Sequence, residues 1–251
     1  MTKSLIASHR GGTLLWGENS RRAFENTLNL PVELVEFDVH PTKDGILVVH
    51  HDATLDRTTD MTGPVNAKTW QELSQGSVNY SGGERIMTLK ELCELYSKSD
   101  IVLRLEIKGD EDKLPYPNIV EQVLSDLEET GMNEQCIISS FNCEVLSDVA
   151  LKAPEIFTIW LVARNMPSLL GAEQVAKIAK EIKANEISVH VSQLMHRTQK
   201  AVKAKNLEYG CYGAHKKADI NKALEFGVYA FTTDRPDLAL TLRDEFMLRT
   251  Q

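Results

Sequence analysis

Short β-rich apolar runs alternate with segments of helical periodicity along the whole chain, and this alternation restricts the folds open to it. The β-rich runs are Leu5–Ser8, Val35–Val39, Ile101–Ile107, Cys136–Phe141, Ile156–Val162, Glu186–Val191, Glu208–Tyr212 and Val228–Thr232. The helical segments have apolar residues at three- and four-residue spacing and are Asn19–Leu30, Thr88–Ser97, Asn118–Thr130, Cys143–Leu151, Ala172–Ala184, His196–Lys205, Lys216–Phe226 and Asp237–Arg249. Eight alternations of this kind predict a (β/α)8 TIM barrel. Because such barrels commonly take about 250 residues, we expect residues 1–251 to form one domain.

The stretch between the second and third expected strands is longer than the others. Its extra length, approximately residues 46–86, contains a returning strand at Ile46–His50 and a part rich in Gly, Asn and Ser. We therefore expect a small insertion after the second barrel strand, above the mouth of the barrel. In TIM barrels, active sites lie at this end, where the strands finish.

Composition argues against several classes of partner. A net charge of −8 and a pI near 5.4 disfavour nucleic acid or an anionic membrane. The first residues hold no apolar run long enough for a secretory signal or a membrane span. The four cysteines lack the close pairing of a zinc site, as in reduced cytosolic proteins, and are Cys93, Cys136, Cys143 and Cys211. We expect a cytoplasmic protein with a small-molecule partner; the oligomeric state is not determined by sequence.

Two carboxylates lie on one face of the second expected strand. Strand side chains alternate in direction, so Glu36 and Asp38 point to the same side. Like charges placed close together in a partly dry site either share a proton or hold a cation. Of these two alternatives, the turn that is predicted after this strand favours the bound cation.

A hairpin is predicted after these carboxylates, with an Asp-Gly bend between apolar strand formers. A bend centred between Asp44 and Gly45 places Asp38 opposite His51. Directly opposed residues have Cβ atoms about 4.5–5.5 Å apart, so a bound ion and an imidazole would meet one substrate. A bulge at Gly45 would shift the pairing by one residue and put His50 in the place of His51.

The third expected strand adds charged residues that face the barrel interior. Arg104, Glu106 and Lys108 alternate with outward apolar residues, and unpaired buried charges are costly. Glu106 would meet Glu36 and Asp38, and three carboxylates suit Mg²⁺ or Ca²⁺ better than zinc. The alternative is a salt-bridge lattice without an ion, formed by Arg104, Lys108, Glu36 and Glu106.

A series of short motifs resembles the glycerophosphodiester phosphodiesterase family. In order, they are His9-Arg10-Gly11, Glu18-Asn19-Ser20, Glu36-Phe37-Asp38-Val39, Thr42-Lys43-Asp44-Gly45, His51-Asp52 through Thr59, Glu106-Ile107-Lys108, Ser140-Phe141 and Thr232-Thr233-Asp234-Arg235-Pro236. The resemblance covers nearly the whole chain. It implies a barrel hydrolase of lipid and glycerol metabolism that uses a divalent metal. Its products would be sn-glycerol 3-phosphate and an alcohol such as choline, ethanolamine or glycerol.

The resemblance also implies roles for individual residues. The metal ligands would be Glu36, Asp38 and Glu106. The general acid and base would be His9 and His51, and the phosphate contacts Arg10 and Lys108. This agrees with diester chemistry, which needs charge neutralisation, a proton acceptor and a proton donor, and with an imidazole pKa of about 6.5. The sequence does not assign acid and base to particular histidines, nor the first attack to water or to the glycerol hydroxyl.

Several polar residues have two interpretations. Glu18 and Asn19 either cap the first helix or orient the metal or substrate. Arg10 either caps a strand or binds phosphate through its guanidinium. The remaining histidines are expected to be structural or surface residues and are His40, His50, His190, His196 and His215.

The chain departs from the family pattern at three places. Trp16-Gly17 stands where a proline usually precedes Glu18. Arg104 replaces an expected small polar residue and is predicted to pair with Glu36 from below. Cys211-Tyr212-Gly213-Ala214-His215 replaces the usual Trp-Thr-Val-Asn. The resemblance implies that this segment lines the glycerol pocket, so substrate preference stays more open than reaction type. A lysophospholipase D-type enzyme would require an apolar groove at the mouth, and a non-catalytic barrel that binds phosphodiesters is the third possibility.

Overall fold

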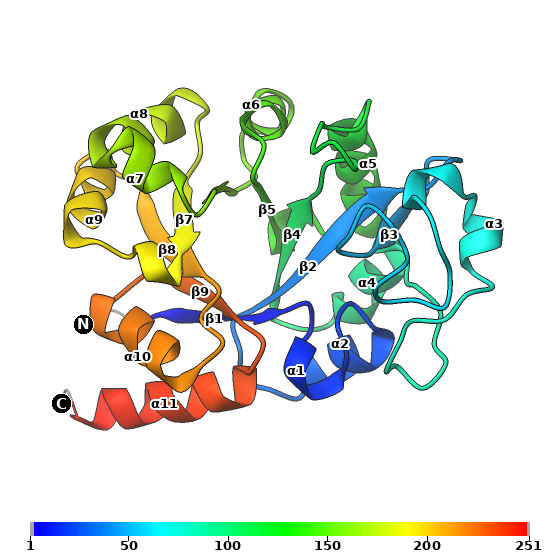
Figure 1. Ribbon diagram of the computed structural model, residues 1–251, viewed down its shortest axis with the longest axis horizontal. Helices are drawn as coiled ribbons and strands as arrows, with labels where there is room; N and C mark the ends of the chain where they lie inside the picture. Colours follow the sequence, from blue (N-terminus) through cyan, green and yellow to red (C-terminus); the bar gives the residue numbers. More distant parts are fainter. Residues whose placement is uncertain (1–2, 250–251) are drawn as a thin grey trace.

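A closed ring of eight parallel strands forms the centre of the molecule, as the sequence predicts (Figure 1). The computed structural model describes residues 3–249, so residues 1–2 and 250–251 of the expected domain lie outside the described part. The strands of the ring are β1 (Leu5–His9), β2 (Leu34–Pro41), β4 (Val102–Ile107), β5 (Cys136–Ser140), β6 (Thr158–Val162), β7 (Glu186–His190), β8 (Glu208–Tyr212) and β9 (Ala230–Thr233). β1 pairs with both β9 and β2, which closes the ring. The fold is therefore a TIM barrel.

Most helices cover the outside of the ring, and one lies in the insertion after β2 (Figure 1). They are α1 (Thr13–Trp16), α2 (Arg21–Thr27), α3 (Trp70–Leu73), α4 (Leu89–Tyr96), α5 (Ile119–Thr130), α6 (Cys143–Lys152), α7 (Met166–Leu170), α8 (Ala172–Glu181), α9 (His196–Lys203), α10 (Lys217–Phe226) and α11 (Pro236–Arg249), with 3-10 turns η1 (Val65–Ala67), η2 (Asn133–Gln135) and η3 (Val191–Gln193). Within residues 3–249, no helix combines the length and the apolar character needed to cross a bilayer.

The main hydrophobic core lies between the strands and the helices. The outward residues of β4, Leu103 and Leu105, are fully buried there. Helix α5 turns Val123 and Leu127 toward them, at the four-residue spacing of one helix face. Because the outward strand positions are filled by aliphatic side chains, the polar residues on the alternate positions point into the ring.

The hairpin after β2 forms, but its predicted register is wrong by one residue. Strand β3 (Leu47–Val49) runs antiparallel to β2 and pairs Val39 with Val49. The backbone N–H of His50 donates to the carbonyl oxygen of Asp38 at 3.0 Å. This is the shifted pairing that a bulge would cause. His50 nevertheless does not replace His51, because β3 ends at Val49 and both histidines lie beyond the paired strand.

The turn and the insertion explain the shift. Gly45 has a φ of 83°, a conformation that a β-carbon disfavours, and the carboxylate of Asp44 accepts the backbone N–H of Trp70 at 2.9 Å. The turn is therefore held by the insertion as well as by its own residues. A second small core stabilises the insertion and consists of Val48, Leu55, Val65, Leu73, Val78 and Ile86.

Candidate active site

Three carboxylates from two neighbouring strands converge inside the barrel mouth. Glu36 and Asp38 lie on β2, and Glu106 on β4 is the register partner of Asp38. Their ligand oxygens all lie within 4.8 Å of one another, and all three residues are buried. Burial and the neighbouring Asp38 raise the pKa of Glu36 to about 7. For Asp38, the charges of Lys108 and Arg10 outweigh burial and hold its pKa well below the ordinary value.

The oxygen ligands of this cluster fit a divalent cation. Asp38 Oδ1 and Asn19 Oδ1 are buried and accept no hydrogen bond within residues 3–249. Lys108 Nζ partly neutralises the cluster, at 2.8 Å from Glu106 Oε1 and 3.4 Å from Asp38 Oδ1. Carboxylate and amide oxygens are hard ligands of the kind that Mg²⁺ and Ca²⁺ prefer.

Arg104 does not pair with Glu36, contrary to the sequence prediction. Its guanidinium lies deeper in the barrel, where Nη1 is 3.9 Å from Oε1 of Glu186 on β7. None of the three guanidinium nitrogens has a hydrogen-bond partner within the described chain. Of the alternative lattice, the pair of Lys108 and Glu106 is present, and Arg104 and Glu36 are not paired with each other.

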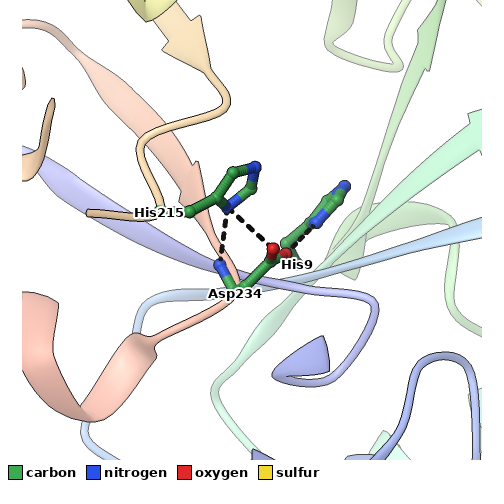
Figure 2. A group of neighbouring side chains, drawn as sticks. All are labelled: His9, His215 and Asp234. Atoms are coloured by element: carbon green, nitrogen blue, oxygen red, sulfur yellow. Dashed lines mark hydrogen bonds and ion pairs between the residues drawn. The ribbon is translucent and has the colours of Figure 1, made fainter. Parts of the chain in front are cut away.

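The two candidate acid–base histidines each have a carboxylate on Nδ1. His9, at the end of β1, has Nδ1 2.5 Å from Asp234 Oδ1, just after β9 (Figure 2). His51 has Nδ1 2.5 Å from Oδ1 of Asp52. An imidazole held at Nδ1 in this way keeps one orientation and leaves Nε2 for a reacting group. His9 Nε2 lies 3.8 Å from Glu36 Oε2, beside the carboxylate cluster.

The surroundings shift the pKa values of these two histidines in opposite directions. Burial lowers the pKa of His9, but the charges of Glu36 and Asp234 outweigh it and the net pKa is raised. Burial also lowers the pKa of His51, and here Asp38 and Asp52 do not compensate, so the net pKa is lowered. These two pKa shifts describe the site without a bound cation. The positive charge of a cation would oppose the negative charge of the carboxylates.

Arg10 connects the first loop to the carboxylate cluster. Its backbone N–H donates to Glu36 Oε2 at 3.0 Å, and its Nε lies 3.4 Å from Asp38 Oδ2. Its Nη1 donates to Glu18 Oε1 at 2.9 Å. Arg10 therefore lies next to the carboxylates, and it lines the smaller of the two cavities of the site.

Glu18 and Asn19 do not cap the first helix. The cap of α2 is Ser20, whose hydroxyl accepts the backbone N–H of Ala23. Asn19 Nδ2 instead donates to Asp38 Oδ2 at 3.1 Å. Glu18 accepts hydrogen bonds from the guanidinium of Arg57 at 2.7 and 2.9 Å. Both side chains thus support the site rather than the helix.

Sequence reasoning gave no role to Asp52, Arg57 or Asp234, which the structure places at the site. Arg57 binds Asp52 as well as Glu18, with Nε donating to Asp52 Oδ2 at 2.6 Å. It therefore fixes the carboxylate that holds His51. Asp52 and Arg57 belong to the motif that begins at His51, and Asp234 belongs to the motif at the end of the last strand. Their place in these motifs was the signal that could have identified them.

Three of the histidines expected to be structural or surface residues also border the site. His190 and His215 line the smaller cavity and His40 lines the larger one, which corrects that expectation. His50 and His196 line neither cavity, as expected. His40 Nε2 contacts the carbonyl oxygen of His51 at 3.0 Å, His50 Nε2 that of Thr54 at 3.0 Å, and the His196 ring stacks on Phe226.

Two cavities meet at the carboxylate cluster. One has a volume of about 700 Å³ and the other about 310 Å³. His51, Glu106, Lys108 and Phe141 line both of them, whereas His9, Arg10 and Glu36 line the smaller one. A molecule with two arms joined by an anionic centre would place that centre beside the cations and imidazoles at the junction.

The whole chain has relatives of known family. The model of the glycerophosphoryl diester phosphodiesterase family matches residues 9–238. A glycerophosphodiester phosphodiesterase of Caldanaerobacter subterraneus subsp. tengcongensis is 31% identical over 96% of this chain and 98% of its own length. The corresponding enzyme of Bacillus altitudinis is 30% identical over 98% of this chain and 99% of its own length.

Solved structures agree with the sequence comparisons. The structure of an Agrobacterium tumefaciens protein assigned as a glycerophosphoryl diester phosphodiesterase superposes with a TM-score of 0.95 at 41% identity, over 98% of this chain and 100% of that one. An Oleispira antarctica phosphodiesterase, solved with the product sn-glycerol-3-phosphate, shares the fold with a TM-score of 0.82 at 23% identity, over 96% of this chain and 97% of that one. The protein belongs to the glycerophosphoryl diester phosphodiesterase family and is a phosphoric diester hydrolase.

Proposed function

We propose that the protein hydrolyses glycerophosphodiesters to sn-glycerol 3-phosphate and an alcohol with the help of Mg²⁺ or Ca²⁺. The observation that carries this proposal is the convergence of Glu36, Asp38 and Glu106 beside two carboxylate-held imidazoles. These three carboxylates would hold the cation. When bound, the ion would act as a Lewis acid that neutralises charge on the phosphoryl oxygens.

The chain's own residues would carry the remaining chemistry. His9 and His51 would divide the proton transfers, one accepting the proton of the attacking oxygen and the other donating to the leaving alkoxide. Asp234 and Asp52 would keep both Nε2 atoms directed at the substrate. Because positive charges close to the reacting centre stabilise a phosphoryl transition state, Arg10 and Lys108 would contact the phosphate oxygens.

The lining of the larger cavity favours a polar alcohol over a lipid chain. Most of its residues carry polar or charged side chains, among them Asp52, Thr54, Glu111, Lys113 and Asn142. A lysophospholipase D-type enzyme would need a continuous apolar surface for an acyl chain. We therefore prefer water-soluble glycerophosphodiesters as substrates and a place in glycerol and lipid-headgroup metabolism. The four free cysteines support a cytoplasmic location.

A turnover assay tests this proposal. Metal-stripped protein is supplied with Mg²⁺, Mn²⁺ or Ca²⁺ and offered glycerophosphocholine, glycerophosphoethanolamine, glycerophosphoglycerol and lysophosphatidylcholine. We expect sn-glycerol 3-phosphate from the first three and loss of turnover with excess chelator. Turnover of lysophosphatidylcholine alone would establish the lipid enzyme instead, and no turnover of any diester would contradict the proposed hydrolysis.

Substitution of the two histidines tests their role in the reaction. General acid–base catalysis contributes about 10²–10⁴-fold, so His9→Ala and His51→Ala should each lower kcat by that order. The control is His196→Ala, which removes an imidazole that stacks on Phe226 and lines neither cavity, so kcat should be unchanged. Full activity in His9→Ala or His51→Ala, with the fold retained, contradicts the assignment.

A further inference from the structure

His51 lies beyond the last hydrogen bond of the sheet, so its position depends on other contacts. The ladder between β2 and β3 ends where the N–H of His50 donates to the carbonyl oxygen of Asp38, one residue before His51. Within residues 3–249, no backbone N–H donates to the carbonyl oxygen of His51. Asp52 holds the imidazole, but it follows His51 directly in the chain. The main chain at His51 therefore has to be supported from another element.

The ring of His40 gives this support. His40 follows Asp38 by two residues on β2, so its side chain lies on the same face of the strand as that carboxylate. The residue is 1% exposed, and its Nε2 lies 3.0 Å from the carbonyl oxygen of His51. Because a carbonyl oxygen only accepts, Nε2 of His40 carries a proton and donates it to this hydrogen bond.

Tyr116 occupies the second nitrogen of the same ring. Its hydroxyl lies 2.9 Å from Nδ1 of His40, and the two rings meet edge to face with their centroids 5.7 Å apart. The ring of His40 is buried between two uncharged partners, which favours a neutral imidazole. A neutral ring with its proton on Nε2 accepts at Nδ1, so the hydroxyl of Tyr116 donates. The hydrogen bonds thus run in one direction, from Tyr116 through His40 to His51.

Tyr116 itself is firmly placed at the end of the loop between β4 and α5. It is 7% exposed and belongs to the main hydrophobic core. The loop before it is closed by Asp110, whose Oδ1 accepts the backbone N–H groups of Asp112 and Leu114, both at 2.9 Å. Residues of this loop also line the larger cavity. The support of His51 therefore starts from a residue that the core holds.

A direct contact with the substrate is the competing role for His40, because His40 also lines the larger cavity. Both of its ring nitrogens are already engaged, one by Tyr116 and the other by the carbonyl oxygen of His51. An imidazole has no further polar atom. His40 can thus offer a bound alcohol only the carbon edge of its ring, and its polar contacts serve His51.

We propose that His40 and Tyr116 are positioning residues that hold the main chain of His51 and thereby aim its imidazole at the junction of the two cavities. The inference rests on the proposed function, in which His51 transfers a proton. Asp52 orients the ring, whereas His40 fixes the backbone from which the ring projects. Because a misplacement of about 1 Å can lower a rate by about 10²-fold, loss of this support should be seen in kcat.

Three substitutions separate the two hydrogen bonds of His40. Glutamine reaches the position of Nε2, so His40→Gln keeps a donor for the carbonyl oxygen of His51. Asparagine reaches only the position of Nδ1, so His40→Asn loses that donor. Tyr116→Phe keeps the ring and removes the hydroxyl. The matched control is Tyr96→Phe, which removes a buried hydroxyl that donates to the carbonyl oxygen of Phe24 at 2.9 Å and lines neither cavity.

Steady-state hydrolysis of glycerophosphocholine by the Mg²⁺-loaded protein gives the first readout. His40→Asn should lower kcat by about tenfold to a hundredfold, and Tyr116→Phe, which loses one neutral hydrogen bond, by about twofold to tenfold. His40→Gln and Tyr96→Phe should stay within about twofold of the wild type, and KM should change by less than about twofold in every variant. Added to His51→Ala, His40→Asn should cause no further loss, because it acts through His51.

Nitrogen NMR of the histidine-labelled, Mg²⁺-loaded protein gives a second readout that needs no turnover. In the wild type, His40 should show the signals of a neutral ring protonated on Nε2. The signals of His51 should shift in His40→Asn and Tyr116→Phe. They should stay close to those of the wild type in His40→Gln and in the control Tyr96→Phe.

Several results would overturn the proposal. These are a wild-type kcat in His40→Asn, an equal loss of kcat in His40→Asn and His40→Gln, a change confined to KM, an additive loss on His51→Ala, or unchanged His51 signals in His40→Asn. Failure of the proposed function is a separate outcome, seen as a wild-type protein that hydrolyses no glycerophosphodiester. The NMR comparison would then still decide whether His40 holds His51.

Discussion

His9 lies at the end of a barrel strand and His51 lies in the insertion, yet both are held in the same way. His9 lies against Asp234 and His51 against Asp52, each through Nδ1. A carboxylate at this nitrogen fixes the tautomer and stabilises the imidazolium form. We therefore expect Asp234 and Asp52 to affect the rate almost as much as the histidines that they hold.

Removal of the charge at Asp234 tests this arrangement. Asp234→Asn keeps the size of the side chain but loses the negative charge that orients His9 and stabilises its imidazolium form, so we expect kcat to fall by about 10²–10⁴-fold with a smaller change in KM. The control is Asp237→Asn, which removes a carboxylate that pairs with Arg235 at the start of α11. Steady-state kinetics on glycerophosphocholine provides the measurement, and equal kcat values in the two variants would refute the role of Asp234.

Strands β4 and β7 bring a second charged pair into the barrel, below the carboxylate cluster. Arg104 and Glu186 are almost completely buried, and both carboxylate oxygens of Glu186 lack a hydrogen bond among the described residues. Burial raises the pKa of Glu186 to about 7, although the charge of Arg104 opposes this shift. Compared with the unfolded chain, the folded protein therefore favours the protonated form of Glu186.

This shift predicts how stability changes with pH. Between the unfolded pKa of Glu186, 4.5, and the folded pKa of about 7, the folded state binds more protons, so stability falls as pH rises. The full loss should be roughly 3–4 kcal/mol, at about 1.4 kcal/mol per pKa unit. Glu186→Gln should remove this part of the pH dependence, and Glu155→Gln, at an exposed position, should not.

Urea unfolding at pH 5 and pH 8 measures this effect. The wild type and Glu155→Gln should lose more free energy of unfolding between the two pH values than Glu186→Gln does. Other buried carboxylates, Glu36 among them, contribute equally to all three proteins, so the difference isolates Glu186. An identical loss in all three proteins would show that Glu186 is ionised equally in the folded and unfolded states.

At the scale of the whole molecule, the barrel was predictable because each strand and helix has its own periodicity. The runs that predicted β1 to β9 need only local sequence, and a parallel ring places their polar ends together. The hairpin register was not predictable, because the contact of Asp44 with Trp70 comes from the insertion. The pairing of Arg104 was missed because its partner, Glu186, lies across the ring on β7.

The site was predictable to the extent that its residues lie in short motifs. Glu36, Asp38 and Glu106 meet because β2 and β4 are neighbours in register. The position of His190 and His215 beside the smaller cavity could not be predicted, because it depends on how β7 and β8 end and on the backbone N–H groups of Ser192 and Asp234. Local sequence contains no periodic signal for such contacts.

A titration of metal-stripped protein with Mn²⁺ tests the metal centre most directly, with bound ion followed by electron paramagnetic resonance and turnover of glycerophosphocholine measured in the same samples. The account predicts that turnover rises in proportion to bound Mn²⁺ and saturates at one ion per chain, and that Asp38→Asn loses both together. Turnover that is complete before any ion binds, or Mn²⁺ binding that survives unchanged in Asp38→Asn, would contradict it.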